Sequence, residues 1–181
     1  MQVGETVQYG DYMITLATYS PSHPIHHKFG VRSLLVRKTD ESPYDAKPVE
    51  HFHFLDWPKN GTPNNPEDLG DFVWQVYLHL QFEPGAVIHC SAGQGRSGTF
   101  MAVLATLMAI NNYLTGDSTD SAFFYTNALS LLPAIQMMRK QRHPWMVKGK
   151  HQLALAYKTL HEVLSKYFKY ENFSEQNSDI F

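Results

Sequence analysis

One segment of this 181-residue chain is apolar on nearly every side of a helix. Residues 97–113 form it, and a helix of this kind is stable only where other elements cover it. Its longest apolar run, residues 100–110, is interrupted by Thr106 and is shorter than the roughly 20 residues that a membrane span needs. The segment therefore predicts a helix inside a packed core.

Composition narrows the class of protein further. Hydrophobic residues make up 43% and charged residues 18% of the chain, which excludes a disordered or fibrous protein. The net charge of −2 is too balanced for binding to nucleic acid or membrane by bulk charge. The single cysteine, Cys90, cannot form an internal disulfide and indicates a reducing compartment such as the cytoplasm. Glu5 and Asp11 interrupt the region where a signal peptide needs an apolar run.

Strands are predicted in the first third of the chain and helices in the rest. Alternating apolar residues predict strands at 12–17, 31–36 and 51–55, and residues 86–89 predict a short buried strand. A helix is expected to begin at Pro66, with Asn65 as its cap. Its apolar face is predicted to consist of Leu69, Phe72, Val73, Val76, Tyr77 and Leu80.

Two more helices are predicted after residue 113. One spans about residues 121–141 with a possible break at Pro133, and the last spans about residues 150–169. The buried side of the last helix is predicted to hold Leu153, Tyr157, Leu160, Val163, Leu164 and Phe168. Residues 171–181 are predicted to be a mobile polar tail. Strands followed by helices around one strand–loop–helix unit predict an α/β domain with a mixed sheet.

The loop before the apolar helix carries the chemistry. It reads HCSAGQGRSG over residues 89–98, so that Cys90 ends the predicted strand and Arg96 opens the helix. Backbone N–H groups of such a loop, together with the helix N-terminus, form an anion cradle. The glycines allow close approach of the backbone, and Arg96 offers a planar pair of donors to a phosphate. The predicted phosphate-binding residues are Ser91, Ala92, Gly93, Gln94, Gly95 and Arg96.

The same positive field is expected to lower the pKa of the Cys90 thiol, and Ser97 can donate a hydrogen bond to the sulfur. A thiolate in a phosphate cradle is a nucleophile for phosphorus. The pattern therefore predicts phosphoryl transfer to Cys90, followed by hydrolysis of the thiophosphate. A merely structural cysteine is the alternative, which the His89–Cys90 pair, the two glycines and the Ser–Gly pair disfavour.

The string HCSAGQGRSGTF closely resembles the signature of the receptor and non-receptor protein tyrosine phosphatases. Residues 9–11, residues 51–58 and residues 138–147 resemble other parts of that catalytic domain, so the resemblance covers most of the chain. It implies a twisted mixed sheet flanked by helices, shortened at the N-terminus, over residues 1–170. It further implies that Cys90 is the nucleophile, that Arg96 clamps the phosphate, that His89 tunes the thiol, and that no metal or cofactor is needed.

The acid loop departs from the family. The family's Trp-Pro-Asp supplies the acid that protonates the leaving oxygen, whereas this chain reads Trp57-Pro58-Lys59. A positioned general acid contributes about 10²–10⁴-fold, and a lysine with an ordinary pKa of about 10.4 suits that role poorly. Asp56 is a candidate substitute if the loop shifts; otherwise it is a solvated loop carboxylate.

Two other departures concern hydrolysis and chain length. Lys148 stands where the family has a glutamine that orients the hydrolytic water, and Gln152 either supplies part of that role or is an exposed helix residue. The family's N-terminal portion, with its phosphotyrosine-recognition loop, has no counterpart, which suggests a short family member or a fragment. We expect an apolar face exposed by this shortening, which a partner could cover.

Taken together, these residues predict a protein tyrosine phosphatase that acts on phosphotyrosine-containing proteins through a phosphocysteine, with low turnover because of Lys59. The alternative is a catalytically impaired pseudophosphatase that binds or traps such proteins. A third hypothesis, a lipid or phosphoserine phosphatase, rests on Gln94 and is disfavoured by the flanking matches. His23, His26 and His27 lie in a loop without a cysteine or paired carboxylates, so no metal site is predicted.

Overall fold

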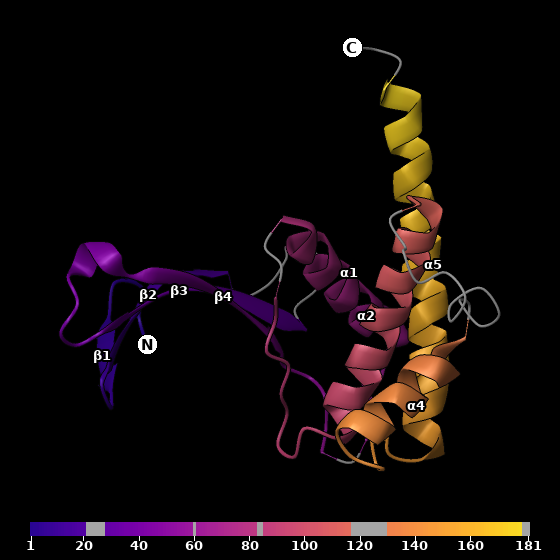
Figure 1. Ribbon diagram of the computed structural model, residues 1–181, viewed down its shortest axis with the longest axis horizontal. Helices are drawn as coiled ribbons and strands as arrows, with labels where there is room; N and C mark the ends of the chain where they lie inside the picture. Colours follow the sequence, from indigo (N-terminus) through magenta and orange to yellow (C-terminus); the bar gives the residue numbers. More distant parts are fainter. Residues whose placement is uncertain (21–27, 60, 83–84, 117–129, 179–181) are drawn as a thin grey trace. The chain divides into compact units, whose positions relative to one another are not determined.

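The computed structural model describes residues 1–20, 28–59, 61–82, 85–116 and 130–178. The chain divides into two compact units, Met1–Asp56 and Trp57–Phe181, and each is described here by itself (Figure 1). The first unit holds the strands and the second holds the helices. The α/β class that the sequence predicts is therefore confirmed.

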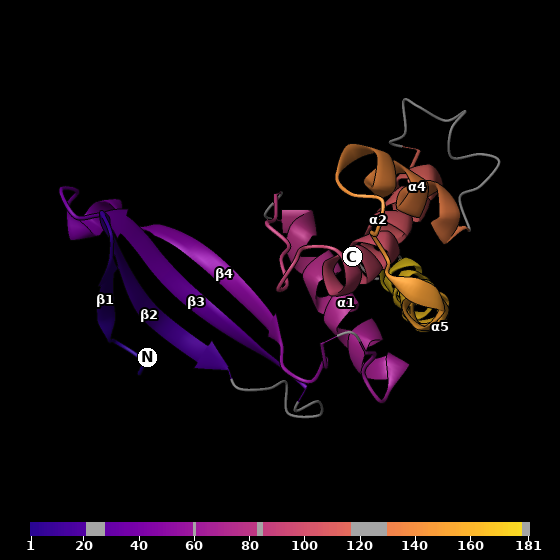
Figure 2. The same cartoon turned by 90° about the horizontal axis from the view of Figure 1, so that it is seen from below.

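The first unit is a four-stranded antiparallel sheet whose strands follow one another in sequence order (Figure 2). The strands are β1 (Thr6–Tyr9), β2 (Tyr12–Ser20), β3 (Phe29–Lys38) and β4 (Lys47–Phe54), with the short 3-10 helix η1 (Pro43–Asp45) before β4. The three predicted strands are confirmed as β2, β3 and β4. Between β1 and β2, Gly10 adopts a φ of +58°, which the tight two-residue turn of a hairpin requires.

The predicted strand at residues 86–89 is wrong. Residues 85–90 are irregular, and Val87 is 94% exposed. A strand needs a neighbour that accepts its N–H groups and donates to its carbonyls, and none of the four described strands pairs with this segment. All three observed pairings are antiparallel, so the mixed sheet that was expected is an antiparallel one in the described residues.

In the described part of the second unit, four helices pack around a common core (Figure 1). They are α1 (Pro66–Phe82), α2 (Gly95–Leu114), α4 (Leu131–Gln141) and α5 (Gly149–Ser178). Helix α2 contacts the other three described helices, and ten of its residues are buried, from Ser97 near its start to Ile110. The one polar residue of its apolar run over residues 100–110, Thr106, is satisfied because its hydroxyl donates to the carbonyl of Ala102 at 2.8 Å. The prediction that this segment is a core helix is confirmed.

Helix α1 begins as the sequence predicts. The Asn65 side chain accepts a hydrogen bond from the N–H of Glu67 at 3.2 Å, and Pro66 occupies the first helical position. The acidic side chains of Glu67 and Asp68 lie at the positive end of the helix dipole. Its predicted apolar face is buried except for Leu80, which is half-buried.

The predicted buried face of α5 is partly wrong. Tyr157 and Phe168 are 41% and 47% exposed. The buried face includes two polar residues, and it consists of Gln152, Leu155, Ala156, Thr159, Leu160, Val163 and Tyr167. The positions are three or four residues apart, as one helix face requires. The prediction used apolar residues only and therefore left out Gln152 and Thr159. As a result, the predicted face is rotated toward solvent relative to the buried face that the structure shows.

Helix α4 and the end of α5 differ from expectation. The Ser130 hydroxyl caps α4 by accepting from the N–H of Leu132 at 3.3 Å, and Pro133 lies in the first turn, where it breaks nothing. The first half of the predicted helix, with Phe123, falls largely outside the described residues. Helix α5 continues to Ser178, so most of the predicted polar tail is helical. No helix within the described ranges is long and apolar enough to cross a bilayer.

We expect Leu107→Ala to lower the free energy of unfolding by about 2–5 kcal/mol, because Leu107 has no exposed surface and the surrounding helices can only partly fill the cavity. Urea denaturation followed by circular dichroism measures this change. Met108→Ala, one position along on the same helix and 36% exposed, is the matched control and should cost clearly less. Equal losses for the two variants would contradict the described orientation of α2.

Candidate active site

A small cleft of about 80 Å³ in the helical unit gathers residues from three segments. The loop before α1 contributes Lys59, the loop ahead of α2 contributes most of the wall, and the start of α5 with the preceding loop contributes the rest. Its lining consists of Lys59, Cys90, Ser91, Ala92, Gln94, Gly95, Arg96, Lys148 and Gln152. All of these are residues that the sequence singles out, and they come from three segments that are distant along the chain.

The loop of residues 90–95 leads directly into the first turn of α2. Gln94 caps the helix, and its carbonyl accepts from the N–H of Gly98 at 2.9 Å. Gly93 adopts a φ of +64°, a conformation that disfavours residues with a side chain. The N–H groups at the start of α2 have no partners within the helix, so the loop and the helix present donors to an anion at this end.

Cys90 is a thiolate at neutral pH. Burial alone would raise the pKa of its thiol, but the Ser97 hydroxyl and the backbone N–H groups of Ser97, Ala92 and Gly93 donate toward the sulfur. Together they lower the pKa of Cys90 from 9.0 to about 6. The Ser97 hydroxyl is buried, and in the described residues it makes no hydrogen bond of full geometry, so its interaction with the sulfur is a loose one and no other acceptor competes for it.

Arg96 is held on two sides. One terminal nitrogen donates to the Ser91 hydroxyl at 2.8 Å, and the other donates to the Trp57 carbonyl at 3.1 Å. The guanidinium therefore links the phosphate loop to the loop that carries Lys59. The indole N–H of Trp57 donates to the Gly61 carbonyl at 3.0 Å, which fixes this loop locally.

Gln152 lies against the phosphate loop. Its side chain is 4% exposed, and its Oε1 accepts from the backbone N–H of Lys148 at 2.8 Å. A β-carbon at Gly95 would lie 2.8 Å from this Oε1, so a larger residue there would force the Gln152 side chain to move. The alternative of an exposed Gln152 is therefore wrong. Its part in hydrolysis stays a prediction.

Behind the cleft, α2 packs against the loop of residues 146–147. A side chain at Gly98 would lie 2.7 Å from the backbone nitrogen of Val147, so only glycine allows this approach. Val147 is buried and adopts a φ of +59°, which is costly for a β-branched residue. Arg139 of α4 holds the strained segment by donating to the carbonyls of Met146 and Val147 at 3.0 and 3.3 Å.

The sequence did not predict these hydrogen bonds from Arg139. Residues 138–142 and 146–147 were noted there only because they resemble the family. The one available signal was an arginine in the last turn of α4 ahead of an apolar pair. It does not reveal that Arg139 binds two carbonyls, or that Val147 takes the left-handed conformation that presents the Lys148 N–H to Gln152.

Two predicted site residues have other surroundings. Asp56, the candidate substitute acid, pairs with Lys28 of its own unit at 2.9 Å. The His89 side chain is exposed, and no described hydrogen bond links it to the Cys90 sulfur. The proposed roles of both residues stay predictions.

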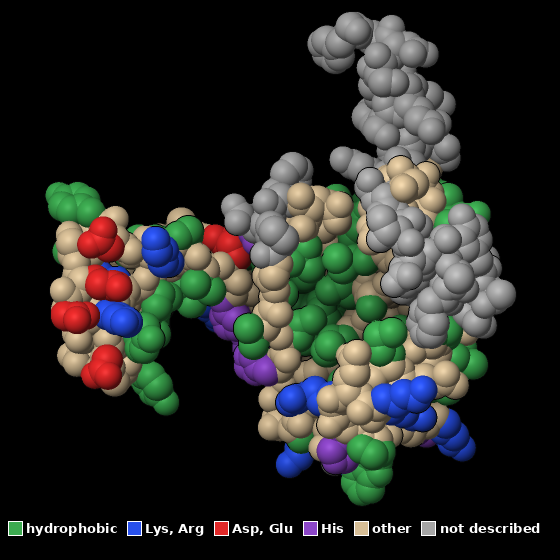
Figure 3. All heavy atoms as spheres, viewed as in Figure 1, with side chains coloured by type: hydrophobic (Ala, Val, Ile, Leu, Met, Phe, Trp, Pro, Cys, Tyr) green, Lys and Arg blue, Asp and Glu red, His purple; other side chains and the backbone are tan. Residues whose placement is uncertain are grey.

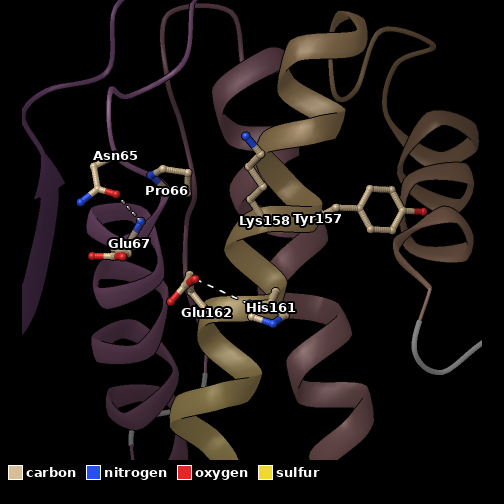
Figure 4. A pocket seen from close by; sticks show the side chains of 7 residues that line it. All are labelled: Asn65, Pro66, Glu67, Tyr157, Lys158, His161 and Glu162. Atoms are coloured by element: carbon tan, nitrogen blue, oxygen red, sulfur yellow. Dashed lines mark hydrogen bonds and ion pairs between the residues drawn. The ribbon is translucent and has the colours of Figure 1, made fainter.

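A larger hollow of about 420 Å³ lies between the start of α1 and the middle of α5 (Figure 4). It combines acidic and basic side chains, among them Glu67, Lys158 and Glu162, and its lining holds no cysteine, serine or threonine. Among the described residues, no three His, Cys, Asp or Glu side chains form a group able to hold a metal ion. The smaller cleft, with a thiolate beside a guanidinium, is therefore the candidate active site.

The chain belongs to the protein-tyrosine phosphatase family, whose sequence model matches residues 1–162. It is 31% identical over 137 residues to the tyrosine-protein phosphatase Lar of Drosophila melanogaster, which is 74% of this chain and 6% of that protein. It is 28% identical over 169 residues to the human receptor-type tyrosine-protein phosphatase alpha, which is 92% of this chain and 19% of that protein. It is 30% identical over 138 residues to the human tyrosine-protein phosphatase non-receptor type 13, which is 76% of this chain and 5% of that protein. The chain thus spans less than a fifth of the length of these relatives.

The rate of alkylation of Cys90 by iodoacetamide should rise with pH and reach half its maximum near pH 6, because the thiolate is the reactive form. Cys90 is the only cysteine, so the signal has one source. In Ser97→Ala the midpoint should move upward, since a donor that lowers the pKa is lost. An unchanged midpoint in that variant would contradict the assigned role of the Ser97 hydroxyl.

Proposed function

We propose that this protein hydrolyses phosphotyrosine in proteins through a phosphocysteine. The observation that carries the proposal is the joining of the Cys90 thiolate and the Arg96 guanidinium in one cleft at the start of α2. The thiolate forms a bond to phosphorus as the bond to the tyrosine oxygen breaks, and the phenolate leaves with the electron pair. Water then attacks the phosphocysteine, which releases inorganic phosphate and restores the thiolate.

We further propose that the first step is slow. Lys59 lines the cleft at the position where the family has its aspartic acid. A carboxylic acid with a pKa below neutrality gives up its proton readily to a developing phenolate, whereas an ammonium gives it up with difficulty. Lys59 can still stabilise the departing phenolate by its charge. The missing proton transfer is expected to cost about 10²–10⁴-fold in the rate of transfer from phosphotyrosine.

Hydrolysis of the phosphocysteine is expected to be weakened as well. Lys148 replaces the glutamine of the family, and an ammonium offers donors but no acceptor for the attacking water. Gln152 is buried beside Gly95, but its Oε1 is already engaged by the Lys148 N–H. One lone pair of Oε1 and the amide nitrogen remain to position water, so Gln152 can supply part of the lost role.

A second candidate function follows from the same departures. Both proton-handling positions are changed while the phosphate cradle is intact, so the chain would bind phosphotyrosine proteins and release products slowly. Removing a group that acts in the transition state harms the chemical step more than ground-state affinity. A pseudophosphatase that binds or traps its targets is therefore the alternative. Phosphotyrosine proteins as partners and a cytoplasmic location are proposals under either hypothesis.

The deficit should depend on the leaving group. The kcat/KM for a phosphotyrosyl peptide, which reports the steps up to transfer to Cys90 and not the later hydrolysis, should be strongly reduced relative to an unimpaired family member. An aryl phosphate with an acidic phenol should be impaired far less, because its phenolate leaves without protonation. Cys90→Ser should abolish both activities and serves as the blank. Equal deficits for both substrates would contradict the missing-acid explanation.

Lys59→Asp should raise kcat/KM for the phosphotyrosyl peptide by at least tenfold, because it supplies a carboxylic acid at the position of the family's acid. The kcat/KM for the activated aryl phosphate should change little. Asp56→Asn is the companion variant and should leave both rates unchanged if Asp56 serves only Lys28. A large loss in Asp56→Asn would instead identify Asp56 as the substitute acid.

A further inference from the structure

We propose that strand β1 pairs with β1 of a second copy of this chain, so that two sheets join edge to edge across a two-fold axis. The inference goes beyond the proposed function, because it concerns the sheet unit and not the cleft. Strand β1 is an outer strand of the sheet, and in the described residues only β2 pairs with it (Figure 2). A free edge presents unpaired N–H and C=O groups, which another strand can bind.

The ladder between β1 and β2 shows which backbone groups lie on the open edge. The N–H of Leu16 donates to the carbonyl of Glu5 at 3.0 Å, and opposed residues of an antiparallel pair alternate between bonded and non-bonded. Counted from this bond, the odd-numbered residues of β1 direct their backbone groups toward β2. Thr6 and Gln8 direct theirs to the open edge, so each offers a donor and an acceptor to a further strand.

A second β1 fits this edge in the antiparallel register that sets Val7 opposite Val7 of the second copy. Thr6 of each copy then lies opposite Gln8 of the other, and each such pair exchanges N–H···O=C bonds in both directions. An axis at Gln8 instead would need the backbone of Gly10, whose carbonyl already accepts from the Gln8 side chain at 3.1 Å. The register centred on Val7 therefore satisfies every outward backbone group of Thr6 and Gln8.

The side chains along this edge suit contact with a second copy. Strand β1 reads TVQY and carries no charged residue and no proline, so the pairing sets no two like charges opposite each other. Val7, Tyr9 and Tyr12 share one face of the sheet and are 41–78% exposed. With Val7 opposite itself, the two sheets keep this apolar face on the same side. Figure 3 shows hydrophobic side chains at the surface of the sheet unit.

The opposite edge of the sheet is protected against such pairing. The N–H of Leu55 donates to the carbonyl of Lys28 at 2.7 Å, so the same alternation directs the backbone groups of Pro48 and Glu50 outward from β4. Proline has no N–H to donate, and prolines and charged residues on an edge strand oppose pairing with another chain. Strand β1 has no such protection, and the second copy is therefore assigned to its edge.

Sedimentation equilibrium of the full chain under reducing conditions measures the association. We expect a weak dimer with a Kd of about 10–100 µM, because the paired edge is short. Val7→Lys should leave the chain monomeric, since two like charges would lie opposite each other at the axis. Val49→Lys is the matched control, because Val49 lies on β4 and is 45% exposed against 41% for Val7. It should leave the Kd unchanged. Circular dichroism verifies that both variants are folded.

Cysteine cross-linking tests the register. Cys90→Ser removes the only cysteine, so a cysteine introduced into this variant is the single source of a disulfide. Val7→Cys should form a disulfide-linked dimer in a glutathione redox buffer, because a non-hydrogen-bonded antiparallel pair places its Cα atoms about 4.5 Å apart, within the range of a disulfide. Tyr9→Cys, on the same face of β1, would lie opposite Glu5 and should cross-link about tenfold less.

The outcomes decide the inference. Loss of the dimer in Val7→Lys, together with cross-linking at position 7 and not at position 9, supports it. A dimer that survives Val7→Lys, or equal cross-linking at the two positions, would overturn it because the contact would lie elsewhere. A chain that stays monomeric and does not cross-link would also overturn it, and would leave the edge to a strand of a different protein. The proposed function stands in each case, since no readout depends on phosphatase activity.

Discussion

The burial of α2 is the constraint on which the rest of the helical unit depends. Its first turn must carry the phosphate loop outward, while its remaining length is enclosed by α1, α4 and α5. Gly98 resolves this conflict, because it allows the strained Met146–Val147 segment to approach the helix backbone. The cost of the left-handed Val147 is offset by burial and by the hydrogen bonds from Arg139. The cleft thus lies at the start of α2, the most buried of the described helices. The packing of α2 in the core therefore fixes the geometry of the cleft.

The charged and polar groups around the cleft then determine which ligand it can stabilise. The Ser97 hydroxyl and the loop N–H groups stabilise a negative sulfur at its base, while Lys59, Arg96 and Lys148 bring positive charge around it. This arrangement stabilises a bound anion well. In the proposed mechanism it serves the two transition states less well, since transfer to sulfur needs a proton at the leaving oxygen and the later hydrolysis needs an acceptor for water. An ammonium gives up its proton with difficulty and accepts no hydrogen bond. Under the proposed function, the same two positions therefore lower the rate and leave the positive charge that attracts an anion in place.

Local chemistry predicted the phosphate loop because its requirements lie within ten consecutive residues: a cysteine, glycines that permit close approach, and an arginine at the start of an apolar helix. The start of α1 was equally local, since Asn65 and Pro66 decide it. The strand at residues 86–89 failed because a strand exists only with a partner, which a run of apolar residues cannot reveal. The face of α5 was misjudged because Gln152 is buried for its contact with Gly95, and that contact joins residues 57 positions apart. Long-range contacts also explain why Arg139 was missed.

The two candidate functions, a phosphatase and a pseudophosphatase, bind the same phosphotyrosine ligand and differ in the rate at which they hydrolyse it. A cleft that holds phosphotyrosine through the loop N–H groups and Arg96 binds it whether or not the phosphorus reacts, so affinity alone does not separate an enzyme from a trap. Lys59 and Lys148 enlarge this difference. Positive charge that stabilises the bound complex without stabilising the transition state equally raises the activation free energy measured from that complex. Each gain in ground-state affinity without an equal gain in the transition state lowers kcat. Under the proposed function, retained binding of phosphotyrosine and a slow turnover are therefore two results of one substitution pattern.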